Sequence, residues 1–357
     1  MRITPKSAFA LASVLTLSLV ACAGDEGDVS DDADDEVADS AEEAEDSNAE
    51  QDGAAEAATE ISSVDELVIG LVPSQDQEGI VEDAEGVAEE LSEELDGFPV
   101  DIFVADNYLG VIQGMQTGDV HLLMSGPVGM IQAEEQAGGV SILQALRDDA
   151  EVYVTQWFTN DPDTYCDDEP VADDEGFLFC NGILDENGEK AEYGPMGEDA
   201  LAAIEDGTTV SYVDEGSASG YYFPETQLNE LGIDVDGQFA GGHDQSVLNV
   251  YNDQMAIGTS FDDARNNVVD ENPDVGEELV VFAWAGPIPN DGIVASGDLA
   301  EEEQQLITDA FVNIAGGGDL TEGDPIYDVY EIEGLVEADD EALDAARQVY
   351  NEFGEDS

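Results

Sequence analysis

From residue 64 onward, short apolar runs alternate with stretches in which apolar residues recur every three to four positions. A short apolar run is typical of a buried strand, and the three-to-four spacing is typical of an amphipathic helix. Strands that alternate with helices in this way predict an α/β fold with a parallel sheet covered by helices on both faces. The first half of the region predicts strands over 67–72, 100–104, 120–124, 140–145 and 152–158, and helices over 79–95, 108–116 and 128–136.

The alternation restarts near residue 198 and continues almost to the end of the chain. Pro287 and Pro289 are expected to interrupt it after a strand. We predict two α/β lobes around a hinge cleft, with residues 63–157 and 286–357 in lobe 1 and residues 158–285 in lobe 2. The pattern here predicts strands over 208–213, 238–240, 255–259, 279–284 and 293–295, helices over 198–205, 220–231, 245–253, 302–315 and 341–353, and a helical turn over 262–267.

The N-terminus has the pattern of a secretion signal. Arg2 and Lys6 precede an apolar run that ends at Ala21, and this run is too short to span a membrane. Leu19-Val20-Ala21-Cys22 resembles the lipobox of bacterial lipoproteins, so we predict a signal peptide over 1–21 and lipidation of Cys22. The alternative is an ordinary signal peptide cleaved after Ala21. Either way we expect an extracytoplasmic protein, and lipidation would anchor it to the outer face of the cell membrane.

Acidic residues dominate the composition, with 88 Asp and Glu against 6 Lys and Arg and a formal net charge of −82. Residues 22–62 have too few apolar side chains to fold, so we expect a disordered acidic tether. This segment does not account for the charge, because 17 of the 88 acids lie in residues 23–60 and 71 follow. A charge of this size argues against nucleic acid as a partner and favours folding in a salty medium, where the repulsion is screened.

Three cysteines are present, and lipidation of Cys22 would leave Cys166 and Cys180. An extracellular compartment permits a disulfide, so we predict that these two staple a surface loop. Metal binding is the weaker interpretation, because neither histidine is near them in sequence. We expect no metal and no cofactor.

The stretch from Thr208 to Pro224 is the most informative one for function. It predicts a strand, a turn, and then a helix that opens with Ser217-Ala218-Ser219-Gly220. The first turn of a helix has unpaired N–H groups and partial positive charge, so it suits a tetrahedral oxyanion. The alternative is a plain helix cap, for which serine is a common choice.

Other polar residues also follow predicted strands. In α/β sheets, ligands bind at the carboxyl ends of the strands, where loops meet helix starts. Each position taken alone is consistent with capping and turn chemistry. Together they suggest one cleft, and the residues are Ser74, Tyr108, Ser125, His243 and Asp262.

From Leu67 to about Leu299 the chain resembles the phosphate/phosphonate-binding protein family of ABC importers. The resemblance implies a type II periplasmic-binding-protein fold, whose two lobes close on a small phosphorus oxyanion and deliver it to the transmembrane subunits of an ABC permease. The matching segments are IGLVPSQ (69–75), DNYLGVIQGMQTGDV (106–120), SGPVGMIQA (125–133), YVDEGSASGYYFP (212–224), GGHDQSVLNV (241–250), GTSFDD (258–263) and GPIPNDGIV (286–294).

The resemblance also implies roles for the candidate residues. Ser217 and Ser219, with the N–H groups of Ala218 and Gly220, would hold the oxyanion. His243 would donate from an adjacent helix start, and Tyr108 and Ser125 would reach in from the other lobe. Asp262 would accept a hydrogen bond from a protonated ligand oxygen or meet an amine. The departures are Ala218 in place of a common threonine, His121 where an aspartate is usual, and the 166–180 loop.

We therefore expect a monomeric solute-binding lipoprotein for phosphonate, phosphite or phosphate, and not an enzyme. None of Arg147, Lys190, Arg265 and Arg347 lies in the matching segments, so we expect neutral donors to hold the anion. The alternatives are a phosphorus-ester hydrolase, although no serine nucleophile elbow is present, and an acidic cation-binding surface protein, although no calcium-loop spacing is present.

Overall fold

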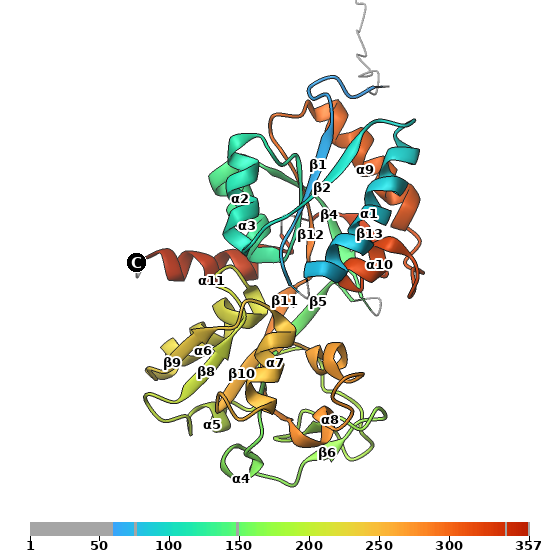
Figure 1. The fold of residues 1–357 in the computed structure, drawn as a ribbon. Coiled ribbons are helices and arrows are strands. Elements are labelled where there is room, and N and C mark those ends of the chain that lie inside the picture. The colour runs from blue at the N-terminus through green and yellow to red at the C-terminus, as the bar shows by residue number, and fades with distance from the viewer. Residues whose placement is uncertain (1–59, 75–76, 148–149, 340, 356–357) are drawn as a thin grey trace, which may run out of the picture. The chain divides into compact units, whose positions relative to one another are not determined.

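In the computed structural model, which describes residues 60–74, 77–147, 150–339 and 341–355, the chain builds two separate β-sheets (Figure 1). The predicted signal peptide (1–21), the lipidation of Cys22 and nearly all of the predicted tether (22–62) lie outside the described residues. No helix within the described ranges is both long and apolar enough to cross a membrane.

The first sheet has six strands and is mixed rather than parallel, which corrects the prediction. Its first three strands along the chain pair in parallel, and the two strands that arrive from the C-terminal part of the chain pair antiparallel. In spatial order the strands are β13 (Gly334–Glu337), β4 (Val140–Leu146), β12 (Gly292–Ala295), β3 (Leu122–Ser125), β1 (Leu67–Leu71) and β2 (Val100–Val104).

Helices cover both faces of this sheet, as the alternating pattern predicts (Figure 1). The chemistry of their ends follows the sequence. Asn107 caps α2 by accepting a hydrogen bond from the N–H of Gly110, and α2 stops at Gly118, whose φ of 78° suits glycine. The helices are α1 (Gln77–Glu94), α2 (Tyr108–Thr117), α3 (Pro127–Ala137), α9 (Glu301–Ala315) and α10 (Pro325–Tyr330), and α11 (Asp344–Glu355) ends the described chain.

The second sheet has seven strands and is also mixed. Its helices are α4 (Pro162–Tyr165), α5 (Glu198–Leu201), α6 (Phe223–Leu231), α7 (His243–Tyr251) and α8 (Val275–Glu278), with a π-helix over Ala218–Tyr222 and a 3-10 helix over Ala264–Val268. In spatial order the strands are β6 (Val171–Ala172), β7 (Leu178–Phe179), β11 (Val280–Pro289), β5 (Val152–Thr159), β10 (Ile257–Phe261), β8 (Thr209–Tyr212) and β9 (Asp236–Phe239).

A separate apolar core lies on each face of this second sheet, because successive side chains of a strand point to opposite faces. Trp157 packs into one core and its neighbour Phe158 into the other, and both are fully buried. Trp157 still satisfies its indole N–H, which donates to Gln227 Oε1 at 2.8 Å.

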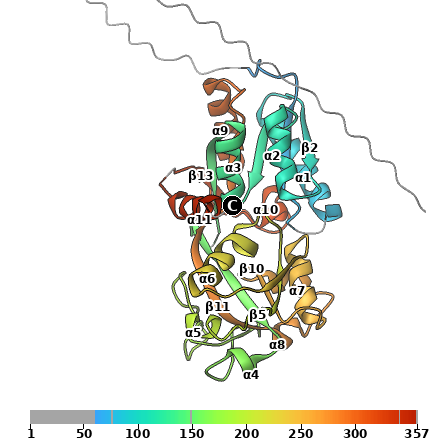
Figure 2. The same ribbon diagram turned by 90° about the vertical axis from the view of Figure 1, so that its left-hand side faces the viewer.

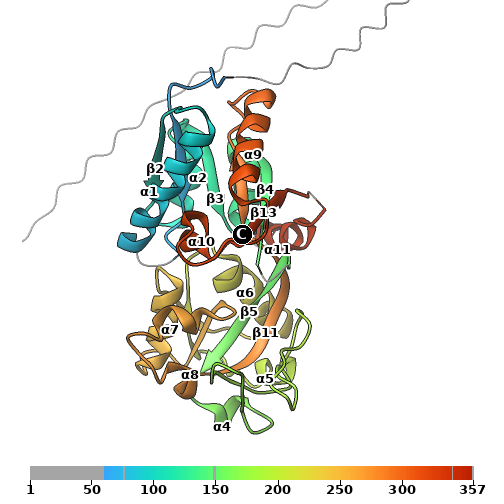
Figure 3. The ribbon, with the colours of Figure 1, turned by 90° about the vertical axis from the view of Figure 1, so that its right-hand side faces the viewer.

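Strands β5 and β11 are the two segments that run from the second sheet toward the first (Figures 2 and 3). They pair antiparallel as far as Val152 opposite Pro289, so the predicted break at Pro287 and Pro289 is wrong. The ladder tolerates the prolines because its register shifts between Ala285 and Ile288, which relieves Pro287 of a ladder hydrogen bond. The predicted lobe boundaries, after 157 and before 286, fall inside these two strands.

The predicted disulfide is confirmed, because Cys166 and Cys180 are bonded. It closes a loop with a sequence separation of 14, and Cys180 is buried. The loop carries the short strands β6 and β7, which the sequence pattern did not indicate.

We expect Cys166→Ala combined with Cys180→Ala to lower the free energy of unfolding by about 3 kcal/mol, since the open loop regains chain entropy in the unfolded state. Chemical denaturation of both proteins, with and without a reductant, measures the effect. The reductant should destabilise only the parent protein. An equal effect of the reductant on both proteins would contradict the prediction.

Candidate functional site

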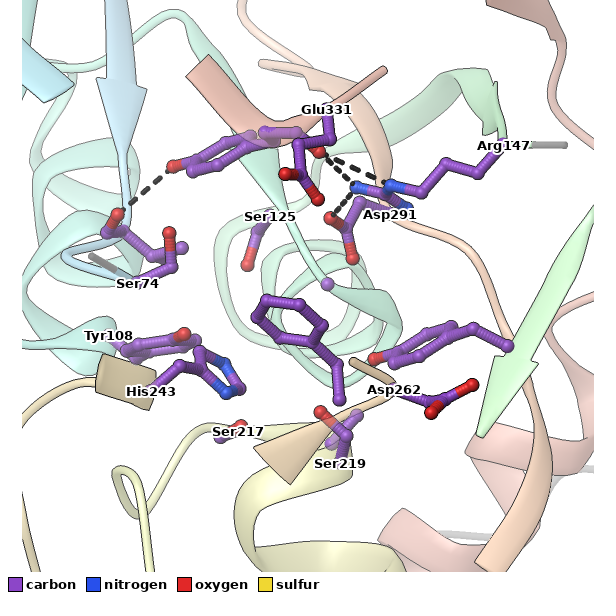
Figure 4. A pocket seen from close by; sticks show the side chains of 16 residues that line it. Ser74, Tyr108, Ser125, Arg147, Ser217, Ser219, His243, Asp262, Asp291 and Glu331 are labelled. Atoms are coloured by element: carbon purple, nitrogen blue, oxygen red, sulfur yellow. Dashed lines mark hydrogen bonds and ion pairs between the residues drawn. The ribbon is translucent and has the colours of Figure 1, made fainter. Parts of the chain in front are cut away.

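A cavity of about 110 Å³ lies where segments of the two sheets meet, and it gathers most of the predicted site residues (Figure 4). Eight of the nine predicted ligand-binding residues line it, and Gly220 does not. From the first sheet and its loops come Ser74, Tyr108 and Ser125; from the second come Ser217, Ala218, Ser219, His243 and Asp262.

The Ser217–Gly220 segment follows strand β8 and opens the π-helix. Ser217 and Ser219 are each 2% exposed, so their hydroxyls are almost completely withdrawn from bulk water. The Ser217 hydroxyl accepts a hydrogen bond from the N–H of Gly220 at 3.0 Å. The capping interpretation of this serine is therefore confirmed. It also lines the cavity, and its role toward an oxyanion stays a prediction.

Gly220 does not take its expected role in this conformation. Its N–H is already bonded to Ser217, so it is not available to an oxyanion. The position needs glycine for a different reason: a Cβ there would lie 2.4 Å from the Val213 side chain and 2.8 Å from Ser217 Oγ. Close packing of the helix start against Val213, which directly follows strand β8, explains this glycine.

His243 begins helix α7 and is 5% exposed. Its Nδ1 lies 2.7 Å from Ser260 Oγ, and its backbone N–H donates to Ser74 O at 3.0 Å, which joins the two halves of the cavity wall. Burial lowers the pKa of His243 to about 4, and the charge of Asp291 opposes that shift. The imidazole is therefore neutral near pH 7, and the Ser260 contact leaves Nε2 as its other polar atom.

The buried neutral state of His243 makes stability depend on pH. Its pKa is near 6.5 in an unfolded chain and about 4 here, so the unfolded state binds the proton first as the pH falls. This group is therefore expected to cost about 3 kcal/mol of stability between pH 7 and pH 4. The measurement is the difference in unfolding free energy between His243→Gln and the parent protein at both pH values, which removes the effect of the carboxylates. A difference that stays constant from pH 7 to pH 4 would contradict the expected shift.

The hydroxyl of Ser125 is a buried polar group of the cavity wall that lacks a hydrogen-bond partner among the described residues. Ser125 ends strand β3 and is 1% exposed. A buried hydroxyl without a partner costs free energy unless something fills that place. An arriving oxyanion would satisfy it.

Asp262 lies deeper than its expected role requires. Its side chain is 3% exposed, and Oδ2 is 2.8 Å from Lys190 Nζ. Figure 4 shows the carboxylate directed away from Ser217 and His243. The second oxygen, Oδ1, is buried without a partner among the described residues. A ligand in the cavity would therefore meet a carboxylate that already has a cationic partner.

Sequence reasoning missed a charged group in the cavity wall. Arg147 and Asp291 both line the cavity and pair at 2.7 Å. That neutral donors hold the anion stays a prediction, because the charge of Arg147 is already paired. Glu331, Tyr153 and Tyr330 line it as well. Arg147 directly follows strand β4, so the strand-end argument that selected Ser125 could have found it. The predicted strand over 279–284 ended too early to indicate Asp291.

Burial and charge act on the tyrosines of this wall. Burial, with the nearby Asp291 carboxylate, raises the pKa of Tyr153 and of Tyr330 above the ordinary range of a phenol. These hydroxyls are therefore protonated at neutral pH, and the Tyr330 hydroxyl donates to the carbonyl oxygen of Val72 at 3.0 Å. Within the described ranges, no group of three or more His, Cys, Asp or Glu side chains is arranged to hold a metal ion.

Comparison with known proteins matches residues 69–343 to a family described as the periplasmic substrate-binding protein of phosphonate ABC transporters. The chain is 25% identical over 216 residues to the phosphate-import protein of Mycolicibacterium smegmatis, covering 57% of each chain. It is 24% identical over 253 residues to the phosphonates-binding periplasmic protein of Escherichia coli, covering 69% of this chain and 65% of that protein. The matched region thus spans less than two thirds of either relative.

A solved structure supports the fold. A Prochlorococcus marinus protein in complex with methylphosphonate superimposes with a TM-score of 0.63 at 20% sequence identity, over 81% of this chain and 98% of that one. At this identity the likeness establishes the fold alone, and it confirms the type II periplasmic-binding architecture expected from the sequence.

Proposed function

The chain belongs to the family of periplasmic substrate-binding proteins of phosphonate ABC transporters, and on that premise we propose that its cavity binds a small phosphorus oxyanion. The family is one of binding proteins and not of enzymes. The observation that carries the proposal is the convergence of buried hydroxyls from both sheets, among which Ser125 Oγ has no partner in the described chain.

In this proposal the oxyanion lies against the start of the π-helix. Ser217 and Ser219 donate their hydroxyls, Ala218 offers its N–H, and His243 donates from a neutral ring. Ser125, Tyr108 and Ser74 complete the shell from the opposite wall. Charge-assisted hydrogen bonds of this kind select for tetrahedral geometry in a site that excludes water.

We further propose that the six-stranded and seven-stranded sheets belong to two lobes that close on the ligand, with β5 and β11 as the hinge. Residues on both lobes would then be presented to a permease only in the closed form. Small-angle scattering with and without saturating ligand tests this step. Identical profiles would contradict closure and leave the binding proposal intact.

The N-terminal segment completes the proposal. A lipid on Cys22 would anchor the protein outside the cell membrane, and the acidic tether would hold the binding domain, as a monomer, away from the surface. The Cys166–Cys180 disulfide supports an extracytoplasmic location, because such bonds persist in oxidising compartments.

Isothermal titration with methylphosphonate, phosphite, phosphate and sulfate tests the binding proposal. We expect stoichiometric binding of at least one phosphorus oxyanion without release of product. Sulfate has the same tetrahedral shape but carries no proton near neutral pH, so it is the control for recognition of a protonated oxygen. If none of the phosphorus compounds binds, the proposal is wrong.

We also propose that this acidic protein needs salt to reach full stability. The free energy of unfolding is expected to rise by about 2 kcal/mol or more between 0.1 M and 2 M NaCl, because salt screens repulsion among its carboxylates. Sucrose at equal osmolality is the control, since it stabilises by exclusion and not by screening. A denaturation midpoint that responds equally to both solutes would contradict a screening effect.

A further inference from the structure

Three of the few cations in this chain lie at or beside the cavity. Of the 6 Lys and Arg residues, four follow residue 60, and each of these four forms an ion pair. Arg147 pairs with Asp291 at 2.7 Å and Lys190 pairs with Asp262 at 2.8 Å, and both of these carboxylates line the cavity. Arg265 pairs with Asp263, the neighbour of Asp262, at 2.6 Å.

The two walls of the cavity differ in their electrostatic character. Ser217, Ser219 and His243 lie on one side, and Asp291 and Glu331 lie across from them (Figure 4). A bare carboxylate on the second wall would repel an oxyanion held on the first, and the repulsion is strong where water is excluded. The same bare carboxylate would attract a ligand that carries an ammonium group.

We propose that Arg147 and Lys190 are specificity-determining residues, which neutralise Asp291 and Asp262 so that the cavity accepts a phosphorus oxyanion without a cationic substituent. This inference rests on the proposed function and names its substrate class: phosphite, phosphate or a short alkylphosphonate, in preference to an aminoalkylphosphonate. The two cations act on the ligand through the carboxylates that they cover.

The structure holds Arg147 in place for this role. Its Nε and Nη2 both donate to the carbonyl oxygen of Tyr330, at 3.2 and 2.8 Å, while Nη2 also reaches Asp291. It is close enough to Glu331 for the two charges to interact. Two further hydrogen bonds fix the guanidinium. It therefore offsets the negative charge of the carboxylates on this wall from where it stands, without moving toward the ligand.

Lys190 is positioned by a local turn. The Asp185 carboxylate accepts hydrogen bonds from the N–H groups of Asn187 and Glu189, and Leu184 and Lys190 form an isolated bridge across the turn. The Lys190 ammonium then reaches Asp262 and lies 5.5 Å from the centre of the Phe179 ring. Lys190 lies outside every segment that carries the family resemblance. Its effect on ligand preference must therefore be measured in this protein.

The test compares Arg147→Met with Arg347→Met. Both variants lose one positive charge, but Arg347 lies on α11 and pairs with Glu134 of α3, and it does not line the cavity. The affinities for methylphosphonate and 2-aminoethylphosphonate are measured by titration in full-length protein. Arg147→Met is expected to weaken methylphosphonate binding about 10- to 100-fold and to shift the preference toward the amine. Arg347→Met should change both affinities less than about threefold.

Two further variants test the inference even if Arg147→Met is less stable than the parent protein. Arg147→Met combined with Asp291→Asn should move methylphosphonate affinity back toward the parent value, because the uncovered carboxylate is gone. Lys190→Met should shift the preference toward the amine in the same direction as Arg147→Met. The inference is overturned if the parent binds methylphosphonate but the ratio of the two affinities is the same in Arg147→Met and Arg347→Met, or if the double variant binds no better than Arg147→Met. A parent protein that binds no phosphorus oxyanion would instead refute the proposed function.

Discussion

Ser217→Ala combined with Ser219→Ala is expected to raise the dissociation constant for methylphosphonate by about two to four orders of magnitude. Each hydroxyl would donate a hydrogen bond to a charged oxygen, and each such bond contributes about 1.5–3 kcal/mol. Both side chains are 2% exposed, so water does not readily replace the missing donors. Titration of the double variant and the parent protein with methylphosphonate measures the loss.

The fold should survive this change, and that separates a binding defect from unfolding. Ser217 also caps the helix, so the double variant should lose about 1 kcal/mol of stability, as helix caps do. Ser141→Ala is the matched control, because that hydroxyl bonds Glu134 and does not line the cavity. A double variant that retains the parent affinity would show that the oxyanion lies elsewhere.

Much of this site was predictable because it depends on sequence-local rules. Ser125 ends an apolar run, and Ser217 opens a helix that follows another apolar run after a short turn. In α/β folds such positions lie at the carboxyl ends of strands, where ligands bind. The helix starts near Tyr108 and His243 carry local signals too, an Asn cap and a glycine pair. The prediction needed only the order of the elements and not their pairing.

Other features depend on pairing between distant segments, which the sequence pattern does not encode. Arg147 meets Asp291 across 144 positions, and nothing near either residue indicates the partner. The N–H of Gly220 bonds to Ser217 where the helix start packs closely against Val213. The sequence pattern does not distinguish such a helix start from one whose N–H groups are free. The continuation of β11 through Pro287 required a register shift that exists only in the paired ladder.

Arg265→Met is expected to lower the free energy of unfolding by about 3–5 kcal/mol, the usual cost of removing one partner of a buried ion pair. Arg265 is fully buried and grips Asp263 through Nε and Nη2, at 2.9 and 2.6 Å. Its Nη1 also donates to the carbonyl oxygens of Leu178 and Leu279. The substitution leaves a buried carboxylate and two carbonyls without their donor. Urea denaturation at neutral pH measures the loss.

The pH dependence distinguishes this cause from simple loss of packing. Burial alone would raise the pKa of Asp263, but the charge and hydrogen bonds of Arg265, together with the charge of Lys190, hold the pKa below its usual range. Without Arg265, the pKa of Asp263 in the folded protein rises above its value in the unfolded chain. The loss of stability is therefore full where the carboxyl is ionised in both states, and it becomes smaller in acid as the folded protein takes up the proton. The difference in unfolding free energy between Arg265→Met and the parent protein should therefore become smaller in acid. At neutral pH, Arg265→Met combined with Asp263→Asn should be more stable than Arg265→Met alone. Arg347→Met, whose pair is partly exposed, should cost less than about 1 kcal/mol. A difference that is independent of pH would mean that Arg265 stabilises the fold through packing between Phe177 and Phe179 and not through its charge.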